Sequence, residues 1–368
     1  MKKNVTSRDV AREAGVSQSL VSPVLNAKPG KSIKPETKRR ILDAAKKLNY
    51  KINVNARNMK SRRAGAIGLL SAWDANSFVF PPVINGLQSV CAANDAGMVL
   101  CTGKKGASGR SDYVDYYLEN RIDGLIYVSY VGIARDGVIA TLEKHGIPFV
   151  CVIGARNIPG VSCADVSFVE SGRMAVNHLV EMGYGSIAYL NGGNLANPVY
   201  AEKERYEGCA GAASALGARL DPINFFEIFN SGEKLEKGVA GLVEGHRYDA
   251  AVSTSFGCFS VLKAAARAGI KVPEELGVIS LDNELYAPFL YPSLTTVDEP
   301  FFDIAVKAAN ILFEKINGFK GCEKVELMPR LSVRESTRRR RLSEIGISAR
   351  NGEIFLRRTV KLFNELIS

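Results

Sequence analysis

From Ala66 onward the chain alternates short apolar runs with longer amphipathic stretches. The apolar runs are typical of buried strands and lie at 66–70, 98–101, 124–128, 148–153, 186–190, 225–229, 250–253 and 277–281. The amphipathic stretches are typical of helices and lie at 82–96, 111–120, 168–182, 202–216, 232–243 and 257–268. Apolar strands joined by helical crossovers predict parallel sheets with helices on both faces. We therefore expect an α/β body of two doubly wound lobes, whose ligands bind beyond the carboxyl ends of the strands.

The N-terminal segment shows a different, purely helical pattern. Val10, Ala11 and Ala14 share one face of a first short helix, and Gly15 allows the backbone to turn. Ser17 can cap a second helix, with Val21, Val24 and Leu25 facing inward and Gln18, Ser19 and Ser22 facing outward. This arrangement predicts a helix-turn-helix, which places the start of its second helix in the major groove of DNA. An ordinary helical hairpin is the alternative.

The charge is distributed very unevenly along the chain. Residues 1–65 carry 17 basic and 4 acidic side chains, residues 66–337 carry 23 and 31, and residues 338–368 carry 8 and 3. The net charges of these parts are +13, −8 and +5, which together give the +10 of the whole chain. A cationic head on an acidic body is expected when only the small head binds the phosphates of DNA.

The composition disfavours several other classes of protein. No run of about 18 apolar residues occurs and no apolar segment follows Met1, so we expect a cytoplasmic protein without membrane contact. The seven cysteines are odd in number, scattered and mostly within apolar segments, which predicts reduced core residues. The three histidines lie far apart, without the spacing of metal ligands. We therefore expect no metal site and no cofactor.

The α/β pattern also fits a dinucleotide-dependent dehydrogenase, but the motifs of such enzymes are missing. No predicted strand is followed by GxGxxG, and the glycines at 192–193 and 103–109 have the wrong spacing. Gly30, Lys31 and Ser32 imitate the end of a phosphate-binding loop, yet Leu25 stands where the first glycine belongs. GxSxG and local Cys/His pairs are absent as well. The sequence predicts no catalytic residues and no enzyme.

Many ordered segments of the chain carry a family resemblance. The head contains TSRDVAREAGVSQSLVSPVLN, ETKRRILDAAKKLNY and NVNARNMK, and the body contains RIDGLIYV, HLVEMGYGSIAYLNGG, GIKVPEELGVISLDN, PSLTTVDEP and VRES. From about Val5 to Ser336 the chain thereby resembles the lactose repressor (LacI/GalR) family of bacterial transcription regulators. The resemblance implies a DNA-binding homodimer with a body of the periplasmic sugar-binding-protein type, whose affinity for DNA depends on a small effector.

The resemblance assigns DNA contacts to the head. It implies that Gln18 and Ser19 read bases, and a glutamine can make a bidentate contact to adenine. Residues implied to contact phosphates are Thr6, Ser17, Ser22, Asn26 and Tyr50. Pro23 is a departure, because the family commonly has an arginine there that reads guanine. Either the second helix bends or stops at Ser22, or the operator differs from the usual family type.

Residues 53–60 match the hinge segment, which in this family becomes helical only when paired with its dimer mate over the minor groove. The implied DNA contacts of the hinge include Asn53 and Arg57, with Ala56 and Met59 as an apolar wedge between base steps. An isolated helix of this length does not persist, so its folding must be coupled to DNA and partner. A basic linker without a specific role is the alternative.

The resemblance places the effector in the cleft between the lobes. Arg205 matches an arginine that bonds ligand oxygens, and Asp282 matches an acidic ligand residue. Trp73, Phe78 and Phe256 are candidates to stack on the face of a sugar, with core packing as the alternative.

Two departures from the family concern the same cleft. Thr254 and Ser255 replace the usual Asn-Asp pair, and Gly154 stands where an acidic residue is often found. Fewer carboxylates imply a different ligand, such as a modified or charged sugar.

The family pattern ends near Ser336, and a basic C-terminal extension follows. It begins with the arginines at 338–341, and Leu356, Val360, Phe363 and Ile367 then recur at helical spacing. Such a helix either pairs dimers into a tetramer or folds back on the body. The expected organisation is a helix-turn-helix head at 1–50, a hinge at 51–65, a two-lobed body at 66–337 and the extension at 338–368.

The sequence thus predicts a ligand-responsive transcription regulator. We expect a repressor that binds palindromic double-stranded DNA as a homodimer and takes a small effector, a sugar or a sugar derivative, between its lobes. The alternative is a cytoplasmic carbohydrate-binding or carbohydrate-modifying protein with a degenerate DNA-binding head, for which Pro23 is the support.

Overall fold

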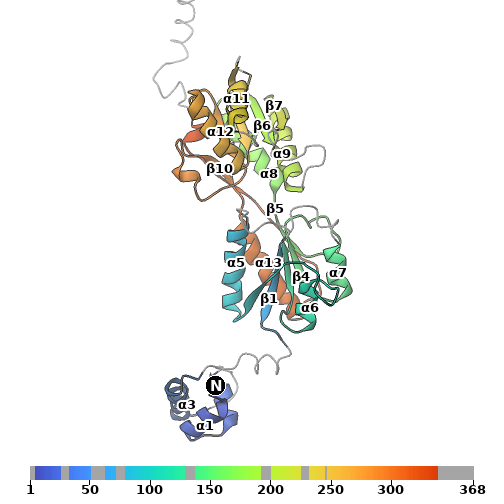
Figure 1. Cartoon of the computed structure of the whole chain (residues 1–368), viewed down its shortest axis with the longest axis vertical. Helices are drawn as coiled ribbons and strands as arrows, with labels where there is room; N and C mark the ends of the chain where they lie inside the picture. Colours follow the sequence, from blue (N-terminus) through green and yellow to red (C-terminus); the bar gives the residue numbers. More distant parts are fainter. Residues whose placement is uncertain are drawn as a thin grey trace, which may run out of the picture.

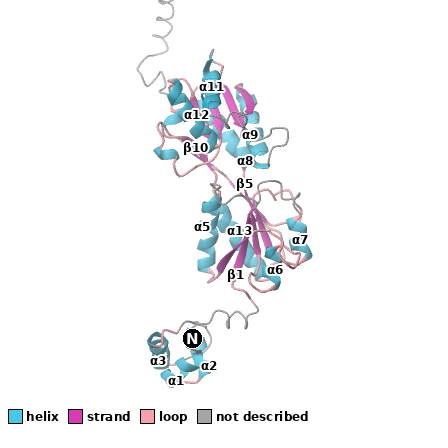
Figure 2. Cartoon of the chain, in the orientation of Figure 1, coloured by secondary structure: helices cyan, strands magenta, loops and turns pink. Residues whose placement is uncertain are grey.

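The computed structural model contains a small helical head and a two-lobed α/β body (Figure 1). It describes residues 5–25, 33–50, 63–71, 79–128, 137–191, 200–224, 232–244 and 247–338. Figure 2 shows the strands of each lobe between layers of helices, as expected for doubly wound sheets. The predicted fold class is confirmed.

The head packs three helices around one small core. The helices are α1 (Ser7–Ala14), α2 (Gln18–Leu25) and α3 (Pro35–Lys47). Between α1 and α2 the backbone of Gly15 has φ 60°, a left-handed conformation that a residue without Cβ adopts at little cost. The core consists of Val10, Ala11, Ala14, Val21, Val24, Ile41, Ala44 and Ala45. The predicted helix-turn-helix is therefore present, and α3 completes its core.

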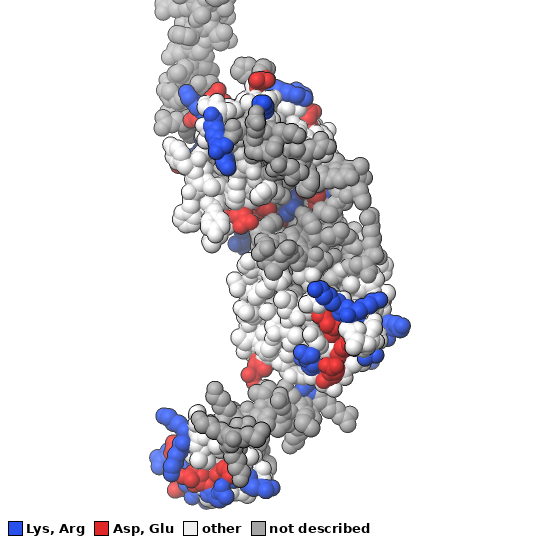
Figure 3. Space-filling model, in the orientation of Figure 1, with Lys and Arg blue, Asp and Glu red and all other residues white. Residues whose placement is uncertain are grey.

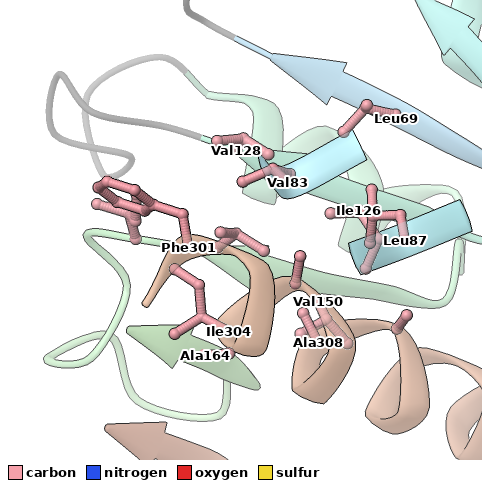
Figure 4. Close-up of a cluster of buried hydrophobic side chains, with 14 of the residues drawn as sticks. Leu69, Val83, Leu87, Ile126, Val128, Val150, Ala164, Phe301, Ile304 and Ala308 are labelled. Carbon is pink, nitrogen blue, oxygen red and sulfur yellow. The ribbon is translucent and has the colours of Figure 1, made fainter. Parts of the chain in front are cut away.

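The first lobe is built on a parallel sheet of six strands. In spatial order they are β11 (Lys324–Leu327), β5 (Cys163–Val166), β4 (Phe149–Val152), β3 (Leu125–Val128), β1 (Ala66–Ser71) and β2 (Gly97–Cys101). Helices α5 (Phe80–Ala93) and α13 (Phe301–Ile316) cover one face, where Ile126 and Val150 meet Leu87 and Ile304 (Figure 4). Helices α6 (Asp112–Leu118) and α7 (Val138–Lys144) cover the other. Both faces are buried, which explains the continuous apolar strands.

The second lobe repeats this plan with one exception. Its strand order is β12 (Arg330–Ser332), β10 (Thr295–Asp298), β9 (Gly277–Ser280), β8 (Ala250–Ser253), β6 (Ser186–Asn191) and β7 (Arg219–Asn224). Helices α8 (Phe168–Glu181) and α9 (Tyr200–Leu216) pack on one face, and α11 (Gly232–Val243) and α12 (Ser255–Ala268) pack on the other. Two short 3₁₀ helices, η3 (Ala287–Phe289) and η4 (Glu335–Thr337), follow β9 and β12. The exception is β12, which pairs antiparallel with β10, so the expectation of purely parallel sheets is wrong at this edge.

The chain passes between the lobes three times. The passages connect β5 to α8, β10 to α13, and β11 to β12. Because β5, β10 and β11 each end at a passage, the carboxyl ends of the parallel strands of both sheets face the junction of the lobes. That junction is where ligands of such sheets bind.

Most predicted elements are confirmed, with specific misses. Every predicted strand except 225–229 overlaps an observed strand, and 225–229 lies outside the described residues. The sequence pattern missed the strands β5, β7, β10, β11 and β12 and the helices α7 and α13. Six of the seven cysteines are buried and Cys322 is exposed, all as free thiols. Among the described residues, no helix has the length and apolar character that crossing a membrane requires.

Candidate DNA-binding surface and interlobe site

The start of α2 presents a polar, exposed face. Gln18, Ser19 and Ser22 are exposed, whereas Val21 and Val24 are buried against α1 and α3. The Gln18 amide Nε2 donates to Ser7 Oγ at 3.0 Å, and Ser17 Oγ lies 2.9 Å from Ser19 Oγ. These exposed polar side chains leave the start of α2 accessible, as entry into a DNA groove requires.

Two residues predicted to contact phosphates also have structural roles in the head. Thr6 caps α1 in a reciprocal capping box: its Oγ1 accepts from the backbone N–H of Asp9 at 3.4 Å, and Asp9 Oδ2 accepts from the backbone N–H of Thr6 at 3.0 Å. Tyr50 is half-buried against the core of the head. Asn26 lies outside the described residues.

Pro23 lies inside α2 and does not end it. The helix continues to Leu25, so the alternative in which it stops at Ser22 is wrong. Pro23 is the sixth residue of the helix and has no N–H to donate to the carbonyl of Ser19.

The described part of the head is basic. Between residues 5 and 50 it contains the cations Arg8, Arg12, Lys34, Lys38, Arg39, Arg40, Lys46 and Lys47, against Asp9, Glu13, Glu36 and Asp43. Figure 3 shows Lys and Arg side chains along the outer edge of the head on the face in view. Exposed cations of this kind attract the phosphates of a duplex without selecting its sequence.

The chain is firmly attached where it enters the first lobe. The two carboxylate oxygens of Asp123 accept hydrogen bonds from the backbone N–H groups of Ala64 and Gly65, both at 2.8 Å. Arg63 Nη2 donates to the carbonyl of Ile316 at 2.8 Å. The predicted hinge contacts Asn53, Ala56, Arg57 and Met59 lie outside the described residues.

At the junction of the lobes, Arg205 of α9 forms a buried ion pair with Glu299, which follows β10. Arg205 Nε donates to Glu299 Oε1 at 2.9 Å and Nη2 donates to Oε2 at 2.5 Å, while Ser171 Oγ donates to Oε1 at 3.2 Å. The side chains are only 1% and 0% exposed. Sequence reasoning missed Glu299. The available signal was the arginine itself, because a buried arginine requires an acidic partner.

Asp282 follows β9 and is 1% exposed. Its Oδ1 accepts hydrogen bonds from the backbone N–H of Ser255 at 2.6 Å, from Ser280 Oγ at 2.8 Å and from Ser255 Oγ. Its Oδ2 is buried and has no hydrogen-bond partner among the described residues. A buried acceptor without a donor is costly, so a donor from a bound molecule would stabilise this oxygen.

Several carboxylates gather around this pair of sites. Burial is the main cause that raises the pKa values of Glu202, Glu284 and Glu299, and the proximity of Asp282 raises all three further. The Arg205 guanidinium opposes the rise of the pKa for Glu202 and Glu299. The region therefore contains four carboxyl groups, of which Glu202 and Glu299 lie near Arg205, and it is rich in hydrogen-bond acceptors.

The other predicted effector contacts lie at the start of α12 or outside the described residues. Thr254 is the N-cap residue of α12, and Phe256 in the first turn of that helix is 70% exposed rather than packed in the core. Trp73 and Phe78 lie outside the described residues.

Polar contacts also join the two lobes directly. Arg156 of the first lobe donates through Nη2 to Glu204 Oε1 of α9 at 2.7 Å, and it also pairs with Glu326 of β11. The Tyr200 hydroxyl of α9 donates to Asp165 Oδ2 of β5 at 3.3 Å. Burial raises the pKa of the Asp165 carboxyl to about 6. These contacts hold the lobes in the arrangement seen here.

The comparisons with known proteins agree with this architecture. Residues 6–53 match the family described as bacterial regulatory proteins, lacI family. Residues 64–237 match the periplasmic binding proteins and sugar binding domain of the LacI family, and residues 176–337 match a periplasmic binding protein-like domain.

Similar curated proteins match nearly the whole chain. The transcriptional regulator RegA of Clostridium saccharobutylicum is 27% identical over 84% of this chain and 92% of its own length. Catabolite control protein A of Priestia megaterium is 26% identical over 91% of this chain and 100% of its own. The transcriptional repressor PurR of Photobacterium profundum is 28% identical over 90% and 98%.

Solved structures show the same fold. The Lac repressor dimer bound to operator and the anti-inducer ONPF has a TM-score of 0.72 at 21% identity, covering 91% of this chain and 99% of that one. The complex of the transcriptional regulator CelR with cellobiose has a TM-score of 0.61 at 23% identity, covering 90% and 100%.

Fold and site together define a helix-turn-helix transcription regulator with a body like a periplasmic binding protein. The chain belongs to the lacI family of bacterial regulatory proteins.

Proposed function

We propose that this regulator is a repressor that binds a near-palindromic operator as a homodimer and responds to a small effector between its lobes. The observation that carries the proposal is the presence, in one chain, of an exposed helix-turn-helix and a buried, unpartnered carboxylate oxygen at the lobe junction. In this proposal residues 1–50 bind DNA, 51–65 form the hinge, and 66–337 dimerise and bind the effector. Relatives named as regulators rather than enzymes support it.

On DNA, we propose base contacts from Gln18 and Ser19 and phosphate contacts from Thr6, Ser17, Ser22, Asn26 and Tyr50. The polar, exposed face of α2 supports this assignment. The hinge would add Asn53, Ala56, Arg57 and Met59 in the minor groove.

The homodimer is supported by an apolar ridge on the second lobe. The ridge consists of Leu285, Tyr286, Phe289 and Tyr291, which are 77%, 63%, 81% and 95% exposed. So many large apolar side chains are rarely left in water, which supports a protein interface at this ridge.

For the effector, we propose a sugar or sugar derivative rich in hydrogen-bond donors. Asp282 Oδ2 would accept from such a ligand, and Arg205 would take part together with its partner Glu299. Thr254, Phe256, Trp73 and Phe78 stay as proposed contacts. The sugar-binding description of the matching family and the cellobiose bound by the structural relative CelR support this class.

The operator is tested by selecting bound sequences from random DNA and footprinting the selected site. Protection of two half-sites whose centres lie about one helical turn apart is expected, because each head binds one half-site. Gln18→Ala should reduce affinity for the selected site by about 1–3 kcal/mol without changing affinity for unrelated DNA. Lys144→Ala, on the first lobe, is the control. A single asymmetric half-site at full occupancy contradicts the proposal, and absence of any footprint supports a degenerate head.

The effector is tested by screening neutral sugars, amino sugars and sugar phosphates for release of the footprinted DNA. Asp282→Asn is expected to abolish the response while leaving operator affinity unchanged, because the residue lies at the lobe junction. An unchanged dose response in this variant would place the effector elsewhere.

A further inference from the structure

The second lobe carries a cavity of about 540 Å³ at the end of its sheet opposite the effector site. Ser186 and Asp249, at the start of β6 and just before β8, line it, so it lies at the amino ends of the strands. We call it the basal pocket. Its apolar wall is formed by Ala240 and Val243 of α11, Ala268 at the end of α12, and Ile270 just after α12.

The basal pocket is acidic. Its described lining contains Glu244, Asp249, Glu274 and Glu275, and neither Lys nor Arg. Two of these carboxylates are engaged locally, because Asp249 accepts from the N–H groups of Gly185 and Ser186 and Glu275 accepts from that of Lys271. The carboxylates of exposed Glu244 and Glu274 contact no other described residue through a hydrogen bond or ion pair. An apolar wall with two available acids fits an amphipathic, cationic occupant.

The described chain ends beside this pocket. The buried Tyr184 hydroxyl lies 3.0 Å from the carbonyl of Pro273 and 3.4 Å from the carbonyl of Thr337. Pro273 immediately precedes Glu274 and Glu275, and Thr337 immediately precedes the last described residue, Arg338. Whatever follows Arg338 therefore starts close to Pro273, next in sequence to Glu274 of the basal pocket.

The segment that follows has the matching chemistry. Residues 339–368 lie outside the described residues and contain seven basic and three acidic side chains, beginning with Arg339, Arg340 and Arg341. An extended chain advances roughly 3.3–3.6 Å per residue, so these arginines start within reach of Glu274. Farther along, Leu356, Val360, Phe363 and Ile367 repeat at helical spacing. A short amphipathic helix does not persist alone and needs an apolar surface.

We propose that residues 339–368 dock into the basal pocket of their own subunit. The arginines at 339–341 pair with Glu244 and Glu274, and the apolar stripe covers the wall formed by Ala240, Val243, Ala268 and Ile270. The basal pocket is thus an intramolecular docking site, and the C-terminal extension is its ligand.

Hydrogen exchange of the full chain tests this docking. Backbone amides of 240–249 and 266–276 should exchange several-fold more slowly in the full chain than in a chain ending at Arg338. The full-length variant Glu244→Lys/Glu274→Lys should lose this protection, and so should the full chain in about 1 M salt, where exposed charges are screened within about 3 Å. Glu143→Lys/Glu314→Lys makes the same charge change on the first lobe and should retain the protection.

Reversing the charges of both the pocket and the extension gives a second test that uses only full-length chains. Combining Glu244→Lys/Glu274→Lys with Arg339→Glu/Arg340→Glu/Arg341→Glu should restore the slow exchange. Equal exchange in the full and shortened chains would overturn the proposal. Light scattering on the same samples measures the mass at each protein concentration. If the slow exchange appears only at concentrations where the mass doubles, the extension binds another copy, which would also overturn the proposal.

Discussion

The Arg205–Glu299 pair concentrates two opposite charges where no water reaches them. Removing one partner leaves the other charge buried and unpaired, which is more costly than losing an exposed ion pair. Arg205→Ala should therefore lower the free energy of unfolding by about 3–5 kcal/mol in chemical denaturation. The partly exposed pair Arg173–Glu170 on α8 is the control, and Arg173→Ala should cost at most about 1 kcal/mol. Equal losses of unfolding free energy in the two variants would contradict a buried ion pair between Arg205 and Glu299.

Asp165 makes stability depend on pH. Its pKa is about 6 in the folded chain against 3.8 for the unperturbed carboxyl, because burial disfavours the charged form. The folded state thus binds this proton more tightly, and the stabilisation present below pH 4 is lost as the pH rises through about 6. As the pH rises from about 4 to above 6, the wild-type chain should lose about 2–3 kcal/mol of unfolding free energy relative to Asp165→Asn. Denaturant titrations of both proteins across the interval measure the difference, and a constant difference would contradict the assignment.

At the scale of elements, α8 and α9 approach each other through two glycines. A Cβ on Gly208 would lie 1.9 Å from the Val169 carbonyl oxygen, and one on Gly172 would lie 2.1 Å from that of Arg205. Gly208→Ala should lower the free energy of unfolding by about 1–3 kcal/mol, because the added Cβ forces α8 and α9 apart. Gly211 lies on the same helix with open space around it, and Gly211→Ala should stabilise the protein by about 0.5–1 kcal/mol. Thermal unfolding of both variants checks the opposite signs.

Helix α2 contains a proline at the position where the family commonly has a base-reading arginine. Since the helix continues through Pro23, an arginine there would extend from the same helix as Gln18 and Ser19. Pro23→Arg should raise affinity for operators with guanine at the matching position by about 1–3 kcal/mol. Pro23→Ala separates this gain from the restored backbone hydrogen bond. If selection from random DNA returns the same bases for all three proteins, position 23 does not face the groove.

The strands that could be predicted from the sequence are those with a continuous run of apolar residues. Burial alone does not decide this, because β5 (CADV) is fully buried but is interrupted by Asp165, whereas β2 is partly exposed but reads as an apolar run. Strands such as β3 and β8 are buried on both faces and appear as apolar runs. Strand β7 could not be recognised, because RLDPIN is an edge strand paired only with β6, where charges and a proline are tolerated. Glu299 could not be assigned to Arg205, because the two are 94 residues apart and only the crossing of the lobes brings them together.

For the whole molecule, the apolar ridge predicts the state of assembly. Phe289→Asp/Tyr291→Asp should convert the proposed homodimer to a monomer, as measured by light scattering. Operator affinity should then fall roughly 100-fold or more, because two linked heads reach their half-sites at high effective concentration. Leu118→Asp, at a half-exposed apolar position on the first lobe, should change neither quantity. A variant with Phe289 and Tyr291 both replaced that still has the mass of a dimer would place the interface elsewhere.

The three passages between the lobes also dictate an order of events during synthesis. Helix α13 and strand β11 belong to the first lobe, yet they lie at 301–327, after all strands of the second lobe except β12. On a ribosome the first lobe therefore emerges early but waits for its last helix and its edge strand until the chain is nearly finished. The head does not have to wait in this way, because its three helices and core lie within residues 5–50. A nascent chain is thus able to fold its DNA-binding head well before either lobe is complete.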